Sequence, residues 1–307
     1  MLPNPLISFK LGNIPIEVYM YGVMIAVGIL ALFFVLFKYS KKLGVNPAFT
    51  DFVYYNAIVS IALGFGSAAV FQGLYDYIEN PENGFSLDSG ITFIGGLIGG
   101  VATFLIIYAI FRKKLKGRLV DSLSIIPCCI LIGHGFGRVG CFFAGCCYGL
   151  PTDSVFGVLF PGHTTPVHPT QLYEAAFLFL MFGICSFLLL KYGFKHNMSL
   201  YLVTYGIFRF LIEFVRNDDR GELVAGISPS QFWSILMVVA GIGLFFLMKH
   251  VLLPRREAEL AKEAAASSAV ADADASEPTA DAPEAVTEAV NNVEEKEEKE
   301  EKEKEEE

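Results

Sequence analysis

Charged residues are scarce through most of this chain, and long uncharged stretches take their place. Asp, Glu, Lys and Arg make up 18% of the 307 residues, while 53% are hydrophobic. The N-terminus lacks the basic beginning and the short apolar centre of a cleavable signal peptide, so no cleaved leader is predicted. The sequence also contains nothing that predicts a nucleic-acid partner. A protein embedded in a lipid bilayer is therefore expected.

Seven apolar stretches follow one another, each about 17–24 residues long and able to cross a hydrocarbon core of about 30 Å. Lys and Arg cluster after the odd-numbered stretches, which cover roughly 18–37, 91–111, 172–190 and 232–248. The even-numbered stretches end instead at Asp76 and Glu79, in the loop after Arg138, and at Asp218 and Asp219. Because cytoplasmic loops carry the excess of Lys and Arg, the N-terminus is predicted outside and the C-terminus in the cytoplasm. The fold class is all-α, a polytopic membrane protein with seven transmembrane helices.

The last part of the chain differs in composition and is predicted to be a separate unit. Residues 257–307 contain 19 acidic and 5 basic residues, whereas residues 1–256 contain 13 acidic and 18 basic residues. The acidic segment lacks aromatic residues and any pattern that would form a core, so disorder or transient helix is expected. The predicted division is a seven-span membrane domain over 1–256 and an acidic cytoplasmic tail over 257–307.

Ionisable residues in the sixth apolar stretch are the first candidates for a functional site. Tyr205, Arg209 and Glu213 follow one another at intervals of four and share one helical face. Arg216 lies one turn beyond Glu213, so two arginines accompany one carboxylate. A self-contained ion pair that holds helices together is the alternative, but the surplus positive charge favours an anionic ligand.

The end of the fourth stretch is rich in glycine around a single arginine. Residues 133–149 contain six glycines, which allow close approach of backbones and non-helical turns. Arg138 lies among them, and its planar guanidinium suits a bidentate contact with phosphate. An arginine that merely reaches from a helix end to the interface is the alternative. The density of glycines favours a phosphate-binding site over this alternative.

A third candidate segment, HPTQLYE at 168–174, opens a helix. His168 lies just before it and is a candidate base or headgroup ligand, and Gln171 and Glu174 lie in the opening turns. On the predicted topology all three segments reach the outer face, together with an irregular glycine-rich piece at 90–100. The expectation is a lipid-facing cavity containing three arginines.

Three of the six cysteines, Cys141, Cys146 and Cys147, lie near that outer face. An oxidising compartment favours a disulfide, and Cys141 and Cys146 are close enough in sequence to pair. A reactive thiol with a redox or modulatory role is a second option. Metal binding together with His134 or His168 is a third option, but the spacing matches no standard zinc pattern, so no metal is predicted. No cofactor is predicted either. The other three, Cys128, Cys129 and Cys185, are expected to pack as small apolar side chains.

Several motifs occur together in a particular order: Tyr21-Gly22, FIGGLIGG, GRVGCFFAGCCYG, HPTQLYE and YGIFRFLIEFVR. In this order the chain resembles the prolipoprotein diacylglyceryl transferase family over about residues 10–250. The resemblance implies transfer of diacylglycerol from phosphatidylglycerol to the lipobox cysteine of secreted prolipoprotein precursors. It also implies the bacterial plasma membrane, with an active site that faces the outer leaflet.

The resemblance also implies roles for individual residues. Arg209, His168 and Tyr205 are the expected catalytic residues. The expected substrate-binding residues are Arg138, Tyr21, Glu213, Arg216, Glu174 and Gln171. Arginines would stabilise the charge that develops on a departing phosphate monoester, and the attacking thiol must first lose its proton.

Two departures from the family pattern keep alternatives open. Ile94 stands where the family's FHGGLIG motif has a histidine, and Cys141 stands where its signature motif has an asparagine. The family's asparagine–glycine–glutamate segment reads Ala144, Gly145 and Cys146. A related enzyme that transfers a lipid or headgroup to another acceptor is one alternative, and a phospholipid-binding protein without enzymatic activity is the other.

Overall fold

The computed structural model describes residues 2, 4–11, 14–87, 90, 92–216 and 228–275 of the chain. Within this part, seven helices are long and apolar enough to cross a membrane. They are α1 (Met20–Lys42), α2 (Pro47–Glu79), α3 (Phe93–Phe111), α5 (Ile126–Ala144), α6 (Thr170–Tyr192), α7 (Asn197–Ile212) and α8 (Pro229–Leu247). The predicted all-α membrane fold with seven spans is thereby confirmed.

Shorter elements connect or extend these helices. An antiparallel hairpin of β1 (Ile7–Leu11) and β2 (Ile14–Val18) precedes α1, with Ile7 opposite Val18. The others are the short helix α4 (Leu119–Ser122), the 3-10 turns Pro81–Asn83, Arg112–Lys114 and Glu213–Val215, the π-helical turn Met248–Leu252, and α9 (Leu253–Ala275).

Some predicted details fall outside the described residues, namely Ile91, the acidic pair Asp218 and Asp219, and the end of the tail at 276–307. The chain divides into two compact units, Met1–Arg256 and Glu257–Glu307. In the second unit the described residues are helical as far as Ala275. The helix in this part agrees with its Ala, Glu and Lys content, since these residues have high helix propensity.

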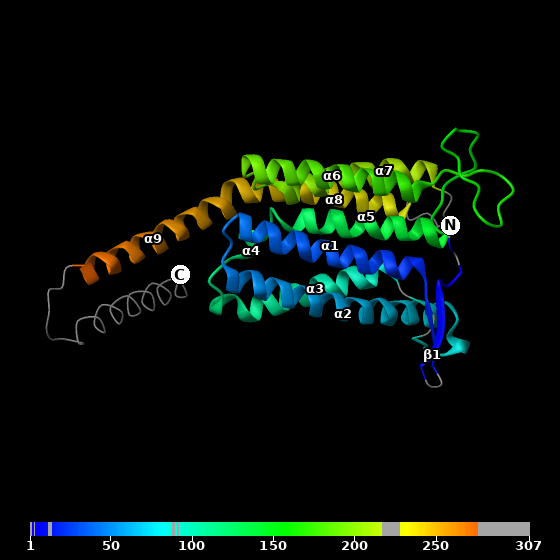
Figure 1. Ribbon diagram of the computed structural model, residues 1–307, viewed down its shortest axis with the longest axis horizontal. Coiled ribbons are helices and arrows are strands. Elements are labelled where there is room, and N and C mark those ends of the chain that lie inside the picture. The colour runs from blue at the N-terminus through cyan, green and yellow to red at the C-terminus, as the bar shows by residue number, and fades with distance from the viewer. Residues whose placement is uncertain are drawn as a thin grey trace. The chain divides into compact units, whose positions relative to one another are not determined.

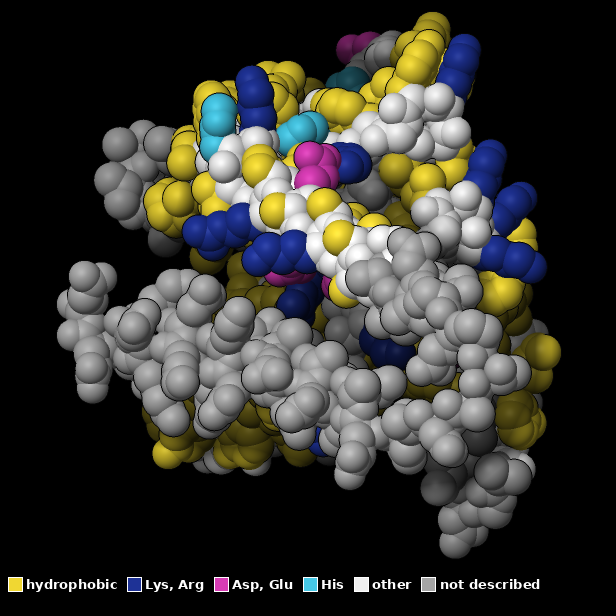
Figure 2. Space-filling model, turned by 90° about the vertical axis from the view of Figure 1, so that its left-hand side faces the viewer, with side chains coloured by type: hydrophobic (Ala, Val, Ile, Leu, Met, Phe, Trp, Pro, Cys, Tyr) yellow, Lys and Arg dark blue, Asp and Glu magenta, His cyan; other side chains and the backbone are white. Residues whose placement is uncertain are grey.

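In the first unit the spanning helices run alternately up and down, so every second connection lies at the same end (Figure 1). The N-terminus, the α2–α3 connection and the long α5–α6 loop share one end, which we call the site end. The connections rich in Lys and Arg lie at the opposite end, and Figure 2 shows Lys and Arg side chains around it. One salt bridge there joins Arg256 to Asp121 at 2.9 Å.

The core of the first unit lies between α1, α2, α5, α6 and α7. Helix α5 packs against both α1 and α6, and α7 packs against α8. Two glycines allow α1 and α5 to approach closely, because a Cβ added at Gly28 would lie 2.9 Å from the carbonyl oxygen of Gly133. Close backbone approach at these glycines holds the helix that carries Arg138 in place.

Helices α2 and α3 form a hairpin of their own along a seam of small residues. A Cβ added at Gly99 would collide with the side chain of Ser67, and one at Gly95 would lie 2.5 Å from the Cβ of Phe71. The prediction of an irregular backbone at 90–100 was wrong for the residues from Phe93 onward, which begin a regular helix. Helix packing in a membrane uses small residues in this way, so these glycines have a packing role.

The glycines of α5 also lie in regular helix. The helix continues through Gly133, Gly135, Gly137 and Gly140 to Ala144, and the chain leaves it only at Gly145, which has φ +72°. The predicted close approach is confirmed, whereas the predicted non-helical turn occurs at Gly145 alone within this helix and its cap. Because α5 is regular helix as far as Ala144, Arg138 and Cys141 lie on continuous helix.

Candidate active site

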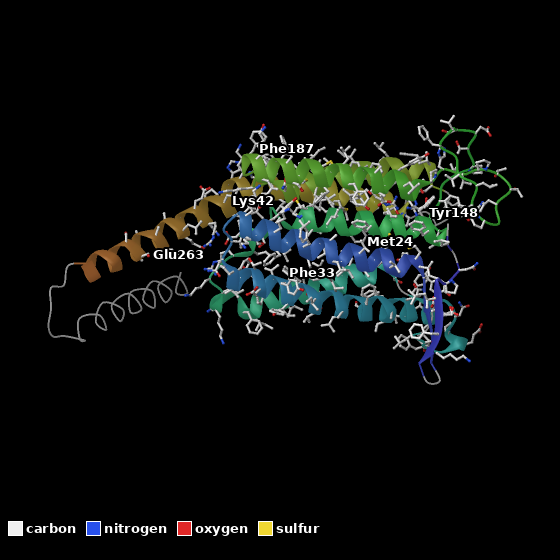
Figure 3. The ribbon with its side chains drawn as sticks, in the orientation of Figure 1. Met24, Phe33, Lys42, Tyr148, Phe187 and Glu263 are labelled. Atoms are coloured by element: carbon white, nitrogen blue, oxygen red, sulfur yellow. The ribbon has the colours of Figure 1, made fainter. Side chains whose placement is uncertain are left out.

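Three chain segments that are far apart in sequence meet at the site end: the last turns of α5, the first turns of α6 and the last turns of α7. Hydrogen bonds and ion pairs join their side chains directly. Figure 3 shows Tyr148 and Met24 toward this end and Lys42 and Phe187 toward the other. The predicted gathering of these three segments is therefore present.

Glu174 on α6 is the centre of the first cluster, and its side chain is fully buried. Tyr205 on α7 donates a hydrogen bond of 2.8 Å to its Oε1, and Arg138 Nε on α5 lies 3.1 Å from its Oε2. His134 Nε2 is 3.6 Å from Oε1 and accepts a 3.3 Å hydrogen bond from Arg138 Nε. A buried carboxylate is costly without such partners, so Glu174 ties the three helices together and orients Arg138.

A second cluster surrounds Glu213 at the end of α7. Arg209 Nη1 lies 2.6 Å from Glu213 Oε2, and its Nη2 donates a 2.9 Å hydrogen bond to Ser230 on α8. Ser228 donates to Glu213 Oε1 at 3.1 Å, and Arg216 Nε lies 3.9 Å from Oε2. Both arginines are mostly buried. The carboxylate therefore interacts with both arginines, as the residue spacing predicted, and α8 supplies the hydroxyls.

Cys141 in the last turn of α5 lies close to Cys146 and Cys147, which belong to the turn that follows the helix, here called the cysteine turn. Gly145 adopts the left-handed conformation and caps the helix through its N–H to Phe142 O, and Cys146 N–H bonds back to Cys141 O at 3.2 Å. Cys147 also has a positive φ, +64°, which is uncommon for a residue with a side chain. This reversal of the chain brings the sulfur atoms of Cys141, Cys146 and Cys147 within 4.8 Å of one another.

Two side chains in the first turn of α6 form hydrogen bonds with the backbone of the cysteine turn. Thr170 Oγ1 donates a hydrogen bond of 2.7 Å to Cys147 O, and Gln171 Nε2 donates one of 2.6 Å to Cys146 O. Both side chains are almost completely buried. Gln171, expected to bind substrate, thus has a backbone partner within the protein and positions the turn.

Hydrogen bonding within the cluster makes the thiols unequal. Hydrogen bonds from Cys141 and Cys146 lower the pKa of the Cys147 thiol, and the positive charges of Arg216 and Arg138 lower it further. The corresponding hydrogen bonds to Cys141 and Cys147 raise the pKa of Cys146. Negative charge in the cluster is therefore favoured on Cys147.

His168 lies at the edge of these clusters. Its backbone pairs with the chain after the cysteine turn, since Gly149 N–H bonds to His168 O at 2.8 Å and His168 N–H bonds to Leu150 O at 3.0 Å. The imidazole Nδ1 is 3.2 Å from the hydroxyl of Tyr173. The residue is partly exposed.

Tyr21 lies in the first turn of α1, and Ile94 lies in the first turn of α3. Tyr21 packs on α5 close to Gly140 and, with Ala144, lines a cavity of about 490 Å³ between the start of α1 and the end of α5. Ile94 is 42% exposed. Its helix packs on α2, so this isoleucine belongs to the hairpin.

Sequence reasoning did not place His134, Ser228 and Ser230 in the arginine clusters. His134 precedes Arg138 by one helical turn, and this spacing was the available signal. Ser228 caps α8 and receives the N–H of Gln231, so its pattern indicated only a helix start. Its second bond, to Glu213, depends on the packing of α7 against α8.

Comparison with known proteins identifies the family. Residues 7–247 match the family model described as prolipoprotein diacylglyceryl transferase. A phosphatidylglycerol–prolipoprotein diacylglyceryl transferase of Clostridium tetani is 37% identical over 243 residues, covering 75% of this chain and 93% of the relative. Transferase 2 of Clostridium perfringens is 31% identical, with 76% and 92% covered, and the Bordetella parapertussis transferase is 35% identical, with 78% and 93% covered. The chain belongs to the prolipoprotein diacylglyceryl transferase family.

Proposed function

We propose that this membrane enzyme transfers the diacylglyceryl group of phosphatidylglycerol to the thiol of the lipobox cysteine of prolipoproteins. The observation that carries the proposal is the convergence of Arg138 from α5, Arg209 from α7 and Arg216 from just beyond the 3-10 turn that follows α7 at one end of the helices. Attack of the thiolate on the glycerol carbon forms the S–C bond and releases glycerol phosphate. Guanidinium groups suit the phosphate that gains negative charge in this step.

Arg138 is the proposed ligand of the lipid phosphate. Its Nε pairs with Glu174, and its side chain is 18% exposed, so part of the side chain is accessible to a ligand. Tyr205 fixes Glu174 by its 2.8 Å hydrogen bond. A pre-oriented arginine loses little conformational entropy when it binds phosphate, which favours both binding and rate.

Arg209 and Arg216 are proposed to stabilise the departing phosphate monoester, with Glu213 between them. Arg209 is held by contacts with Glu213 and Ser230, which restrict its fork to one orientation. Tyr21 is proposed to contact the lipid from the cavity beside α1. His168 is the proposed proton carrier at the aqueous edge, consistent with the partial exposure of this residue.

We further propose that the site end faces the outer leaflet of the bacterial plasma membrane, with the N-terminus outside. The support is the distribution of Lys and Arg, which gather in the connections at the opposite end (Figure 2). A site on the outer side would meet precursors as they leave the cell interior. Accessibility of single cysteines introduced at Glu82 and Lys114 to an impermeant maleimide would test this orientation.

The function is tested with the purified full-length chain in bilayers that contain phosphatidylglycerol, with a synthetic lipobox peptide and mass spectrometry. A diacylglyceryl mass gain on the peptide cysteine is expected. Arg138→Ala should reduce the rate at least about 100-fold, in the range found when one donor to a developing anion is removed. Arg138→Lys keeps the charge but loses the planar fork. Its rate should lie between the rate of the unmodified protein and that of Arg138→Ala.

Arg112→Ala is the matched control, because this arginine lies in the turn after α3 at the opposite end. It should retain the rate of the unmodified protein. Full activity of Arg138→Ala would contradict the proposed phosphate ligand. Bound phosphatidylglycerol without any mass gain on the peptide would favour a different acceptor.

A further inference from the structure

The proposed roles of the arginines leave the three thiols at the end of α5 and in the turn that follows it without a role. The sulfurs of Cys141, Cys146 and Cys147 lie within 4.8 Å of one another. Two thiolates bound to one zinc ion at about 2.3 Å in a tetrahedral arrangement lie about 3.8 Å apart. Small rotations of the side chains would therefore place all three sulfurs around a single ion.

The backbone of this turn has the features of a built site. It is reversed by Gly145 and by the uncommon positive φ of Cys147, and such conformations persist where surrounding contacts enforce them. Thr170 and Gln171, both almost fully buried, donate hydrogen bonds of 2.7 and 2.6 Å to the carbonyl oxygens of Cys147 and Cys146. Both contacts fix the backbone from which the Cys146 and Cys147 thiols project.

We propose that Cys141, Cys146 and Cys147 bind one Zn²⁺ as thiolates, and that the fourth coordination position takes the thiol of the acceptor cysteine. Zinc sites with three protein ligands keep one position open for water or substrate, whereas structural sites use four. Cys146 is exposed and the other two are partly exposed, so the open position is accessible from the site end. The catalytic half of this inference rests on the proposed transferase function, and the metal site does not.

The reaction at such a site balances without an oxidant or reductant. The acceptor thiol replaces the zinc-bound water and releases its proton to solvent. Its sulfur then uses an electron pair to form the S–C bond with the glycerol carbon of the lipid, while the C–O bond to phosphate breaks and leaves its pair on glycerol phosphate. The product is a neutral thioether, a weaker ligand than a thiolate, so water replaces it.

The charges around the cluster suit this arrangement. Three thiolates and Zn²⁺ have a net charge of −1, and a bound substrate thiolate makes it −2. Arg138 precedes Cys141 by three residues on α5, and Arg216 forms a backbone bridge with Gly149 just after the cluster, so their positive charges would offset this excess. The same arginines are the proposed phosphate ligands, so the nucleophile and the leaving group would meet at one place.

A disulfide accounts for the cluster less well. It would use two of the three sulfurs and leave the third unexplained, although all three are mutually close. Cys146 and Cys147 are adjacent in sequence, and the Cys146 thiol points back to Cys141 O at 3.7 Å. A metal ion uses all three thiols in the geometry that the turn imposes.

The metal site is tested by titrating Co²⁺ into the reduced, metal-free full-length protein in detergent. Sulfur-to-cobalt charge-transfer absorption and tetrahedral d–d bands should saturate at one ion per chain, and Zn²⁺ should displace the cobalt. Cys146→Ser should weaken binding by more than the roughly 10–100-fold typical when a group that merely orients a ligand is lost. Cys129→Ala, a thiol buried elsewhere in α5, is the matched control and should bind as the unmodified protein does.

Because Cys146 is exposed, its replacement should leave the fold intact, and size-exclusion chromatography checks this. Cys141→Ser provides a second variant with the same expected loss of binding. Absence of the charge-transfer band would overturn the proposal. So would a disulfide between any two of the three cysteines in protein purified without reductant.

The open position is tested by adding the lipobox peptide to the cobalt protein without lipid. The peptide should strengthen the charge-transfer band, and a matched peptide with Ser in place of Cys should leave it unchanged. Equal spectra with both peptides would overturn substrate coordination. Removal of the metal should abolish mass gain in the transferase assay, and added Zn²⁺ should restore it.

The two proposals fail in different ways. Full transfer by the metal-free protein would overturn the catalytic role of the zinc ion and leave the transferase function standing. A cobalt spectrum that responds to the Cys peptide, without any transfer from phosphatidylglycerol, would contradict the proposed reaction and support the site.

Discussion

The α2–α3 hairpin and the cluster of α5, α6 and α7 are both apolar and both span the membrane, yet they are used differently. In the most apolar window of α3 only 6% of residues are buried inside the protein, against 39% in α6. The hairpin exposes its hydrophobic side chains to lipid and holds together through glycines. In the cluster of α5, α6 and α7, carboxylate, arginine and tyrosine side chains are buried between the helices. Apolar composition places a helix in the bilayer, and polar contacts decide which helices build the site.

The largest effect is expected from the carboxylate at the centre of the cluster. Glu174→Ala removes the partner of Arg138 and Tyr205, and breaking a buried pair costs about 3–5 kcal/mol of the free energy of unfolding. Transfer should fall below detection. Thermal unfolding in detergent and the peptide assay measure the two effects.

The matched control lies in the hairpin. Asp51 is an exposed carboxylate near the start of α2. Asp51→Asn should change stability by no more than about 0.5 kcal/mol and leave transfer unchanged. Similar losses in both variants would contradict the distinction between the two regions.

A second comparison uses apolar side chains. Leu178 on α6 is fully buried, and Leu178→Ala should leave a cavity and cost about 2–5 kcal/mol. Ile106 on α3 is 59% exposed, and lipid can fill the space left by Ile106→Ala, so little change is expected. Chemical denaturation of both variants in the same detergent checks the difference, and a larger loss for Ile106→Ala would refute it.

A smaller effect should follow loss of the Tyr205 hydroxyl. Tyr205→Phe leaves Glu174 Oε1 without its 2.8 Å hydrogen bond, which costs about 1–3 kcal/mol. Transfer should fall roughly tenfold as Arg138 loses its fixed orientation, since about 1.4 kcal/mol corresponds to a factor of ten. Phe208→Leu, on the same helix but stacked on Phe177, tests whether any change of an α7 ring has this result. An equal fall in rate for that variant would argue against the hydrogen bond as the cause.

The smallest effect on transfer is expected from the glycine seam of the hairpin. Gly99→Ala forces a Cβ against Ser67 and should cost about 1–3 kcal/mol of stability, with the rate retained at temperatures where the protein stays folded. Gly66→Ala is the control, because nothing lies within 4 Å of a Cβ at that position. A loss of rate without a loss of stability in Gly99→Ala would place the hairpin within the site.

Much of the site was accessible from sequence because helical spacing is local. The intervals between Tyr205, Arg209 and Glu213 predicted a shared face, and Glu213 does contact Arg209. The partner of Tyr205 was not predictable in this way, because Glu174 lies on another helix. Likewise, glycine content indicated close approach but could not say whether the backbone stays helical.

The sequence by itself determined the seven spans and the placement of Lys and Arg between them, because apolar length and charge act locally along the chain. Only the tertiary structure decided that Glu174 would join Arg138 and Tyr205, and that Gln171 would hold the cysteine turn. The reason is physical: each buried polar group must find a partner, and in these cases the partner comes from a neighbouring helix. The three sulfurs likewise meet only because Gly145 and Cys147 reverse the chain.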